Sequence, residues 1–476
     1  MKRTDRSVCT LAKREVGPVP LTANGTVEPG TDRVVYSEPM TTTSTELPLS
    51  LPPSPEVTLH WFLPTNGDSR GIVGGGHGAG AEVGDRFPDL RYLTQLAQAA
   101  EYNGFESVLT PTGRWCQDSW LTTAALLSAT DRLKFLVAFR PSLVPAALLA
   151  QQVQTYQELS DNRLLLNVVV GGEDAEQRSF GDHTTKEERY AIADEALDAA
   201  SRLWSEPGPV NYEGEHVRIE GGVLARRPRV VPRIFFGGSS PAGIEVAARR
   251  AEVYLTWGEH PDEVAEKLSR VAARAAEYGR TLEYGIRLHV ISRDTEEEAW
   301  ASAQRLYDSL DPDAVARAQA GLRTSQSESQ RRIAEIHGRG AAFRQGGDAR
   351  DLEFFPGLWS GIGLVRGGAG TALVGSHDQV AENIDRFRAA GIRHFILSGY
   401  PHLEESFYVG EGTVPALLRR GVTVTNHPEP RVPSVSSETG SSVGGKPAGA
   451  LSGTQINPVI DTSVDHAAVS SVGGAS

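Results

Sequence analysis

Residues 133–170 read LKFLVAFRPSLVPAALLAQQVQTYQELSDNRLLLNVVV, and this stretch carries the pattern that decides the fold. Two apolar runs, at 133–140 and 163–170, flank a segment of helical character at 145–159. A strand followed by a helix and a second strand is the unit from which parallel sheets are built. The stretch therefore predicts two parallel strands joined by a helix.

The same alternation continues on both sides of this unit. Further strand-like runs lie at 57–63, 106–110, 233–236, 253–257, 283–292 and 394–398, and further helix-like segments lie at 89–103, 187–204, 261–277, 295–310 and 378–390. Eight strands alternating with helices predict an α/β protein with a parallel sheet, and at this length a closed (β/α)8 TIM barrel. A doubly wound open sheet is the alternative that the pattern leaves open.

The two ends of the chain differ from its middle. Residues 1–55 are rich in Thr, Pro, Ser and charge, and residues 427–476 are rich in Ser, Gly, Val and Pro. Such segments bury too little apolar surface to offset the entropy of ordering, so we expect both to be disordered. The barrel domain is then expected at 56–426. Within it, 64–88 form a Gly-rich loop, and 311–356 form a charged, weakly periodic insertion of the kind that is often a lid.

The composition argues against several classes of protein. The formal net charge of −13, from 60 acidic and 47 basic side chains, disfavours general nucleic-acid binding. The two cysteines, Cys9 and Cys116, cannot build a disulfide framework or a cysteine-rich metal site, and we predict no metal. No apolar segment follows the basic N-terminal residues, and no run approaches about 18 apolar residues. We therefore expect a cytoplasmic protein that does not enter a membrane.

Two glycine-rich stretches are candidates for binding a phosphate group. The stretch GAGAEVG at 78–84 is close to a dinucleotide fingerprint, but no strand leads directly into it and Pro88 soon follows, so we interpret it as a loop. The better candidate is the turn of Gly237, Gly238, Ser239 and Ser240, after which Pro241 begins a helix. The N–H groups and dipole of a helix start favour an anion, although an ordinary capped turn uses the same residues.

Polar side chains gather at the carboxyl ends of the predicted strands. Arg287 and His289 share one face of their strand, and an inward arginine needs an acidic partner or an anionic ligand. Asn167 interrupts an apolar strand, so its amide is either paired with backbone or presented to a ligand. The same rim also holds Cys116, Arg189, Tyr190, Arg366, Tyr400 and His402. Ordinary packing or an internal salt bridge explains each residue alone, but their distribution is typical of a barrel enzyme for an anionic ligand.

Seven longer motifs resemble those of one known family. They are WFLPT at 61–65, PTGR at 111–114, LVAFRPS at 136–142, YLTWGE at 254–259, GIRLHVI at 285–291, GLVRGGAG at 363–370 and LSGYPHLEE at 397–405. In this order they resemble the alkanesulfonate monooxygenases of the bacterial luciferase superfamily. The resemblance extends from about residue 57 to residue 424.

The resemblance implies a two-component, flavin-dependent enzyme. A separate NAD(P)H:FMN reductase supplies reduced FMN, and with O₂ the enzyme converts a sulfonate to an aldehyde and sulfite. The implied catalytic residues are Cys116, Arg287, His289, Arg366 and Tyr400, and the implied cofactor-binding residues are Asn167, Tyr190, Gly237, Gly238, Ser239 and Ser240. The insertion at 311–356 resembles the family's mobile lid, and the family suggests a homotetramer.

The chemistry of a sulfonate agrees with these roles. A sulfonate is a permanent monoanion with three acceptor oxygens, so protonation cannot neutralise it. A guanidinium is also permanently charged, and its fork of donors suits such a group. Arg287 and Arg366 are the two arginines that the motifs supply.

The chain also departs from the family pattern. Asn66 stands where the family usually has a histidine, the loop at 70–84 is longer, and the lid carries extra residues around 340–350. These departures concern the substrate more than the flavin. Two other functions stay open: a luciferase-like monooxygenase that acts on another compound or uses a deazaflavin, and a non-catalytic flavin-binding protein.

Overall fold

A closed barrel of eight parallel strands forms the centre of the computed structural model, which describes residues 51–76, 80–81, 84–339 and 343–426. The barrel strands are β1 (Glu56–Phe62), β4 (Ser107–Thr110), β5 (Lys134–Phe139), β6 (Leu164–Val168), β9 (Ile234–Gly237), β10 (Val253–Trp257), β11 (Glu283–Arg293) and β15 (His394–Ser398). Strand β15 pairs in parallel with β1, which also pairs with β4, so the sheet closes on itself. The predicted TIM barrel is confirmed, and the alternative of an open sheet is wrong.

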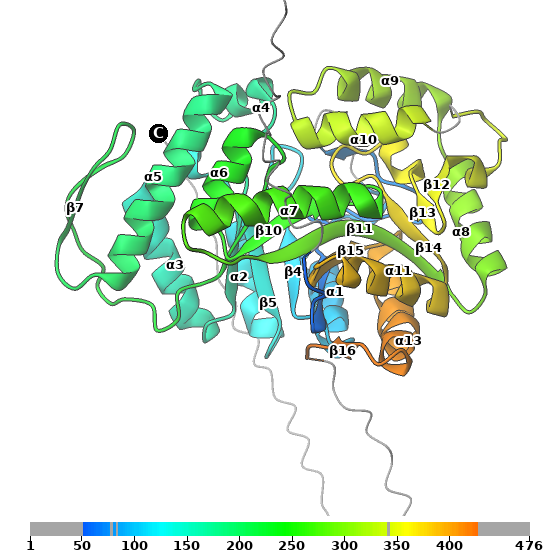
Figure 1. Ribbon diagram of the computed structural model, residues 1–476, viewed down its shortest axis with the longest axis horizontal. Coiled ribbons are helices and arrows are strands. Elements are labelled where there is room, and N and C mark those ends of the chain that lie inside the picture. Colours follow the sequence, from blue (N-terminus) through cyan, green and yellow to red (C-terminus); the bar gives the residue numbers. More distant parts are fainter. Residues whose placement is uncertain (1–50, 77–79, 82–83, 340–342, 427–476) are drawn as a thin grey trace, which may run out of the picture. The chain divides into compact units, whose positions relative to one another are not determined.

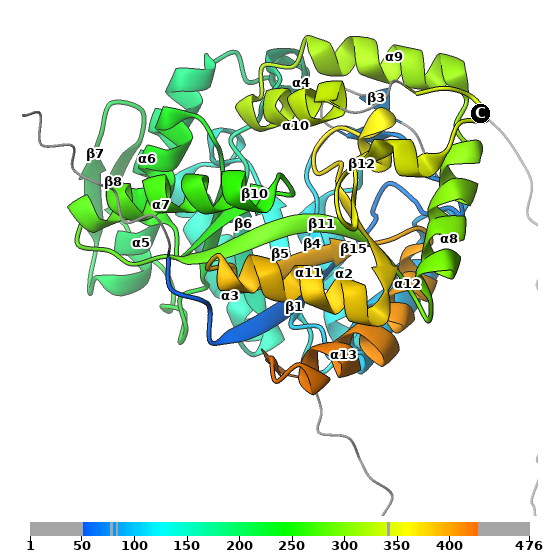
Figure 2. The ribbon, with the colours of Figure 1, turned by 45° about the vertical axis from the view of Figure 1, so that its right-hand side comes forward.

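Helices follow the strands and cover the outside of the barrel (Figures 1 and 2). They are α1 (Leu90–Tyr102), α2 (Ser119–Leu126), α3 (Ala146–Ser160), α4 (Asp174–Ser179), α5 (Lys186–Ser205), α6 (Pro241–Arg250), α7 (Pro261–Glu277), α8 (Glu296–Asp308) and α11 (His377–Ala389), with α12 (His402–Phe407) and α13 (Val414–Arg419) after the last strand. A capping box begins α5, where Thr185 and Glu188 bond each other's backbone N–H groups.

The strands bury side chains on both faces. Inside the barrel, one apolar cluster takes a residue from almost every strand, including Phe62, Phe235 and Ile396. The opposite faces of the same strands pack under the helices, as Ile286 and Leu288 of β11 do. Strand residues alternate between the two faces. Arg287 therefore points into the barrel, between neighbours that point out of it.

The insertion at 311–356 is more regular than the sequence predicted. It contains α9 (Pro312–Arg323) and α10 (Glu328–Arg339), followed by the short strands β12 (Glu353–Phe355) and β13 (Leu358–Trp359). Asp311 caps α9, and its Val315, Ala318 and Leu322 are buried at helical spacing. The apolar stripe is narrow and lies among many charges, so the periodicity is weak in the sequence. Strand β13 pairs with β14 (Ala372–Ser376), which extends the sheet beside β11.

Two other additions lie outside the barrel. A hairpin of β7 (Val210–Glu213) and β8 (Arg218–Gly222) follows α5 and extends away from the barrel in Figure 1. Strands β2 (Gly75–Gly76) and β3 (Gly80–Ala81) pair in the loop after β1. This hairpin is not the strand–turn–helix that a dinucleotide fingerprint requires. Residues 77–79 and 82–83 of that stretch lie outside the described residues.

Most of the two expected disordered ends also lies outside the described residues. Ser54, within the expected N-terminal extension, is buried and donates its N–H to the carbonyl of Arg388 at 3.0 Å, so the packed region begins before residue 56.

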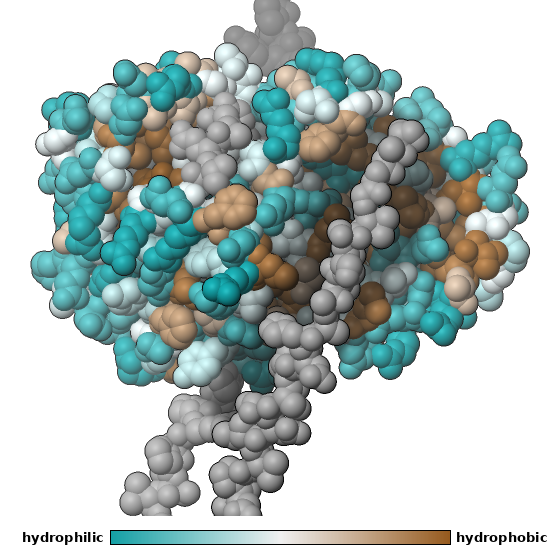
Figure 3. Space-filling model, turned by 180° about the vertical axis from the view of Figure 1, so that it is seen from behind, coloured by the Kyte–Doolittle hydropathy of each residue, from teal (hydrophilic) through white to brown (hydrophobic). Residues whose placement is uncertain are grey.

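None of the described helices is long and apolar enough to span a membrane. Among the same residues no group of three His, Cys, Asp or Glu side chains is placed to hold a metal ion. The surface seen from behind mixes hydrophilic and hydrophobic residues (Figure 3).

Candidate active site

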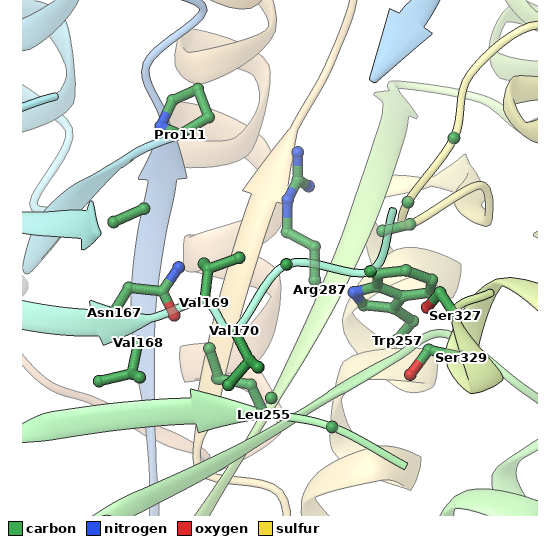
Figure 4. A pocket seen from close by; sticks show the side chains of 18 of the residues that line it. Pro111, Asn167, Val168, Val169, Val170, Leu255, Trp257, Arg287, Ser327 and Ser329 are labelled. Carbon is green, nitrogen blue, oxygen red and sulfur yellow. The ribbon is translucent and has the colours of Figure 1, made fainter. Parts of the chain in front are cut away.

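A cavity of about 220 Å³ opens at the carboxyl end of the barrel. All eight barrel strands contribute to its wall, through Phe62, Leu109, Ala138, Asn167, Val168, Gly237, Leu255, Trp257, Arg287 and Ile396. Figure 4 shows Asn167, Arg287 and Trp257 among the side chains that surround it. Active sites of this fold lie at this end, where the loops after the strands supply the chemistry.

The start of α6 forms one wall of the cavity. Ser240 is the N-cap: its hydroxyl accepts the N–H of Gly243 at 3.2 Å and donates to the hydroxyl of Tyr190 at 3.1 Å. A Cβ on Gly238 would lie only 3.3 Å from the Cα of Gly243, so glycine allows the turn to pack closely on the helix. Gly237, Gly238, Ser239, Ser240 and Tyr190 all line the cavity. The predicted phosphate turn therefore presents helix N–H groups and hydroxyls to a shared space.

The end of β6 and the two residues after it form an apolar wall of the same cavity. Val168, Val169 and Val170 line the cavity together with Trp257, and Asn167 is the amide among them. A flat aromatic ring would fit against such a surface, with one amide available to its polar edge. These residues suit the ring system of a flavin, and the turn at the start of α6 suits its phosphate.

Two buried guanidinium groups also line the cavity. Arg287 and Arg366 are 8% and 6% exposed, and they lie 4.7 Å and 5.6 Å from the ring centroid of Phe62. Arg287 bonds the carbonyl of Leu288 at 2.7 Å, and Arg366 bonds that of Val73 at 3.4 Å. Burial and the charge of Arg366 lower the pKa of Arg287 to about 9. Within the described part of the chain, no ion pair joins either arginine to a carboxylate.

His289 and Tyr400 lie behind the two arginines rather than on the cavity wall. Their rings stack with centroids 5.6 Å apart, and His289 Nδ1 lies 2.8 Å from the hydroxyl of Ser398. Burial, followed by the charges of Arg287 and Arg366, places the pKa of His289 well below its usual value. The ring is therefore neutral near pH 7. Tyr400 donates to the carbonyl of Val73 at 3.4 Å.

Cys116 also lies off the cavity wall. Its thiol donates to the carbonyl of Gly113 at 3.4 Å, and burial raises its pKa to about 12. The nucleophilic form of cysteine is the thiolate, which this environment suppresses. Cys116 can act as a hydrogen-bond donor, whereas the environment disfavours a charged nucleophile.

The end of the loop between α9 and α10 and the first residues of α10 close over the cavity, which Ser327, Glu328 and Ser329 line from that side. The two helices lie together beside α4 in Figures 1 and 2. Ser325 donates to Glu173 at 2.5 Å, and the hydroxyl of Ser329 lies 3.0 Å from that of Ser239. The insertion is thus held across the mouth by hydrogen bonds, in the position that a lid would occupy.

Sequence reasoning missed several residues of the site. Asp68 and Tyr92 were not singled out, yet Asp68 is hydrogen-bonded to His402 at the start of α12, and Tyr92 donates its hydroxyl to Asp68. Nothing in the sequence marks Asp68, because its partner His402 is 334 positions away. Trp115 and Trp257 line the cavity without a local signal of their own. Trp257 lies within the motif YLTWGE at 254–259, whereas Trp115 directly follows the motif PTGR at 111–114 and is not part of it.

Comparison with known proteins gives one family match. Residues 57–394 match the family described as luciferase-like monooxygenase. Similar solved structures include a riboflavin lyase with modified FMN (19% identity, TM-score 0.63, 79% of this chain and 94% of that chain). A long-chain alkane monooxygenase matches at 20% identity with a TM-score of 0.62 over 79% and 94% of the two chains. The protein DmoA from Hyphomicrobium sulfonivorans matches at 20% identity with a TM-score of 0.61 over 77% and 89%.

Proposed function

The chain belongs to the luciferase-like monooxygenase family, and from this premise we propose that it is a two-component enzyme that converts alkanesulfonates to an aldehyde and sulfite with reduced FMN and O₂. The fold relatives act on different compounds, as the names long-chain alkane monooxygenase and EDTA monooxygenase indicate. The substrate must therefore be argued from the site of this chain.

The pair Arg287 and Arg366 carries the proposal. A buried guanidinium keeps its charge at a high cost in solvation unless an anion compensates it. Both groups are buried and face one cavity, and among the described residues neither forms an ion pair. An anionic ligand with several acceptor oxygens removes this cost and satisfies both forks of donors. A sulfonate has this charge and this number of acceptors.

Reduced FMN fits the remaining part of the cavity. Ser239, Ser240 and Tyr190 with the start of α6 would hold the phosphate, and Asn167 would bond the polar edge of the ring. Bound there, the reduced flavin supplies the electrons that activate O₂. The closed loop at Ser327 would exclude water from this chemistry.

Two partners belong to the proposal. We expect a separate NAD(P)H:FMN reductase, because the described residues of the glycine-rich stretch form a hairpin rather than a nucleotide-binding turn. We also expect a homo-oligomer, and the resemblance to the alkanesulfonate monooxygenases suggests a tetramer. Large apolar side chains are exposed on or next to α1, α2 and α3: Phe87, Leu90, Tyr102, Leu121, Leu148 and Leu159. Such side chains are the kind that subunit contacts cover.

Sulfite release tests the proposal directly. The purified protein is supplied with an FMN reductase, NADH, O₂ and alkanesulfonates of increasing chain length. We expect sulfite that depends on the reductase and is lost in Arg287→Ala but not in Arg331→Ala, which changes an exposed arginine on α10. Tight binding of reduced FMN without release of sulfite from any sulfonate would contradict the proposal that alkanesulfonates are the substrates. Oxygenation of another compound, or turnover with a reduced deazaflavin only, would then identify the alternative.

A further inference from the structure

Asp68 and His402 form a buried pair next to the two arginines. Asp68 is fully buried, and its Oδ1 lies 2.8 Å from Nδ1 of His402, a side chain that is 1% exposed. The carboxylate also accepts the backbone N–H of His402 at 2.7 Å, the N–H of Ser69 at 2.9 Å and the hydroxyl of Tyr92. Four donors thus hold Asp68 as an ionised acceptor, so the proton of the imidazole lies on Nδ1.

The other nitrogen of His402 is left as a bare acceptor. Within the described part of the chain, Nε2 is buried and has no hydrogen-bond partner. A buried polar atom without a hydrogen-bond partner destabilises the fold, so its retention indicates a use. An imidazole oriented by a carboxylate on one nitrogen and free on the other is the arrangement of a general base.

The position of His402 connects it to the anion site. Its ring centroid lies 5.8 Å from that of Phe62 and 5.1 Å from that of Tyr400. The ring of Phe62 lines the cavity, and the guanidinium groups of Arg287 and Arg366 lie over this ring. His402 therefore lies one aromatic ring away from the place where an anion would bind.

His289 is the less suitable base of the two histidines. Its Nε2 also has no hydrogen-bond partner in the part of the chain that the structure describes, but its Nδ1 is held by the hydroxyl of Ser398 instead of a carboxylate. A neutral hydroxyl does little to stabilise the imidazolium that forms when a base takes up a proton. Asp68 provides that stabilisation for His402.

We infer that His402, oriented by Asp68, is the base that breaks down the 1-hydroxyalkanesulfonate through which a sulfonate oxygenated at its first carbon yields an aldehyde. This inference rests on the proposed function. His402 is the catalytic residue of this step, and Asp68 is a positioning residue that acts through it.

The step balances without a further reactant. His402 Nε2 takes the proton of the hydroxyl group, and the O–H electron pair becomes the second bond of the new C=O group. The C–S bond breaks, and its electron pair leaves with sulfur as sulfite, which then takes the proton from the imidazolium. The charge on the sulfur group grows from one to two as it leaves. Arg287 and Arg366 therefore bind the leaving group more strongly than the substrate, which lowers the barrier.

His402 does not line the cavity, so contact between its Nε2 and a ligand requires side chains to move, and we propose Arg366 as one that does. This side chain lies over Phe62, and the hydrogen bond that the structure gives its guanidinium is a long one, 3.4 Å, to the carbonyl of Val73. The neighbouring glycines Gly367 and Gly368 give its loop freedom, and the φ of Gly368 is 99°. Binding of the sulfonate to the guanidinium would draw it away from the ring.

The test uses the substrate of this step and no oxygenation. 1-Hydroxybutane-1-sulfonate, made from butanal and sulfite, is given to the full-length protein with oxidised FMN and no reductant, and sulfite is trapped as it forms. We expect the wild type to accelerate breakdown above the rate in buffer. His402→Gln and Asp68→Asn should each lower kcat roughly a hundredfold with little change in KM. The control His183→Gln changes an exposed histidine and should match the wild type.

Two results would overturn the inference. One is a wild type that does not accelerate breakdown, which needs no variant to fold. The other is a folded His402→Gln or Asp68→Asn variant that retains the wild-type rate, or that changes KM alone. Failure of the proposed function looks different, because it abolishes sulfite release from alkanesulfonates in the complete flavin assay. Release from alkanesulfonates without acceleration of the hydroxysulfonate leaves the proposed function intact and removes only the role of His402.

Discussion

Arg332 on α10 forms an ion pair with Glu259, and Nη2 of the arginine lies 2.6 Å from Oε2 of the glutamate. Glu259 is 1% exposed and follows β10, while Arg332 belongs to the insertion that closes the cavity. The contact therefore joins the wall of the barrel to the lid. Glu259 also forms an ion pair with the buried Lys267, so its carboxylate still has one cationic partner when Arg332 is replaced.

Loss of Arg332 is expected to open the lid without unfolding the barrel. Arg332→Gln removes a hydrogen-bonded charge pair, and such bonds contribute about 1.5–3 kcal/mol. Amide hydrogen exchange in residues 312–336 should become roughly tenfold faster, while exchange in the barrel strands stays unchanged. Mass-spectrometric exchange measures both regions at once.

The neighbouring Arg331 provides the matched control. It is exposed and pairs with Glu328 and Glu335 on its own helix, so Arg331→Gln should leave lid exchange near the wild-type rate. Equal exchange in both variants would show that the contact with Glu259 does not hold the lid.

Arg287 is expected to contribute to ligand binding at the expense of stability. Arg287→Met removes a buried cation that has no acidic partner among the described residues, so the unliganded variant should melt at the same temperature as the wild type or higher. An alkanesulfonate at a hundred times its Kd should stabilise the wild type by about 2.7 kcal/mol. The variant should lose most of this gain.

Thermal denaturation with and without the sulfonate measures both effects. A primary alcohol of the same chain length controls for apolar binding, and Arg202→Met, at an exposed ion pair, controls for loss of a surface charge. A sulfonate that stabilises Arg287→Met as much as the wild type would place the anion elsewhere.

The eight strands could be predicted because each one is a short apolar run on which the fold depends. The run at 163–170 contains β6, which spans 164–168, and the run at 283–292 matches β11 within one residue at its end. The start of α6 was also readable, because Ser240 and Pro241 act locally as cap and first helical residue. Local signals of this kind act over a few residues, so the sequence shows them directly.

The chemistry that depends on distant pairs was not readable in the same way. Asp68 is hydrogen-bonded to His402, which lies 334 positions away in the chain. Arg332 is hydrogen-bonded to Glu259, which lies 73 positions away. The sequence placed His402 at the rim but gave no indication of its partner. Burial raises the pKa of Cys116, and the sequence does not show that its thiol is buried.

Tyr190 is expected to distinguish FMN from riboflavin. Its hydroxyl accepts from Ser240 and lines the cavity at the start of α6, where the phosphate would bind. Tyr190→Phe leaves the N-cap of α6 in place but removes one donor, which should weaken FMN binding roughly tenfold. Riboflavin, which has no phosphate, should bind both proteins equally well. Flavin fluorescence titration measures the two affinities, and an equal loss for both flavins would remove Tyr190 from the phosphate site.

Cys116 is expected to resist alkylation at neutral pH. Burial raises its pKa to about 12, so the thiol is protonated below that value and the thiolate forms only as the pH approaches it. At pH 8 an ordinary thiol has a substantial thiolate fraction, and Cys116 should react with iodoacetamide on the order of a thousandfold more slowly. Peptide mapping by mass spectrometry follows the modification, with free glutathione in the same tube as the reference. Because the group acts as a neutral donor to Gly113, Cys116→Ser should retain sulfite release within a few fold. Rapid alkylation at pH 7–8 together with an inactive Cys116→Ser variant would instead require a thiolate in the reaction.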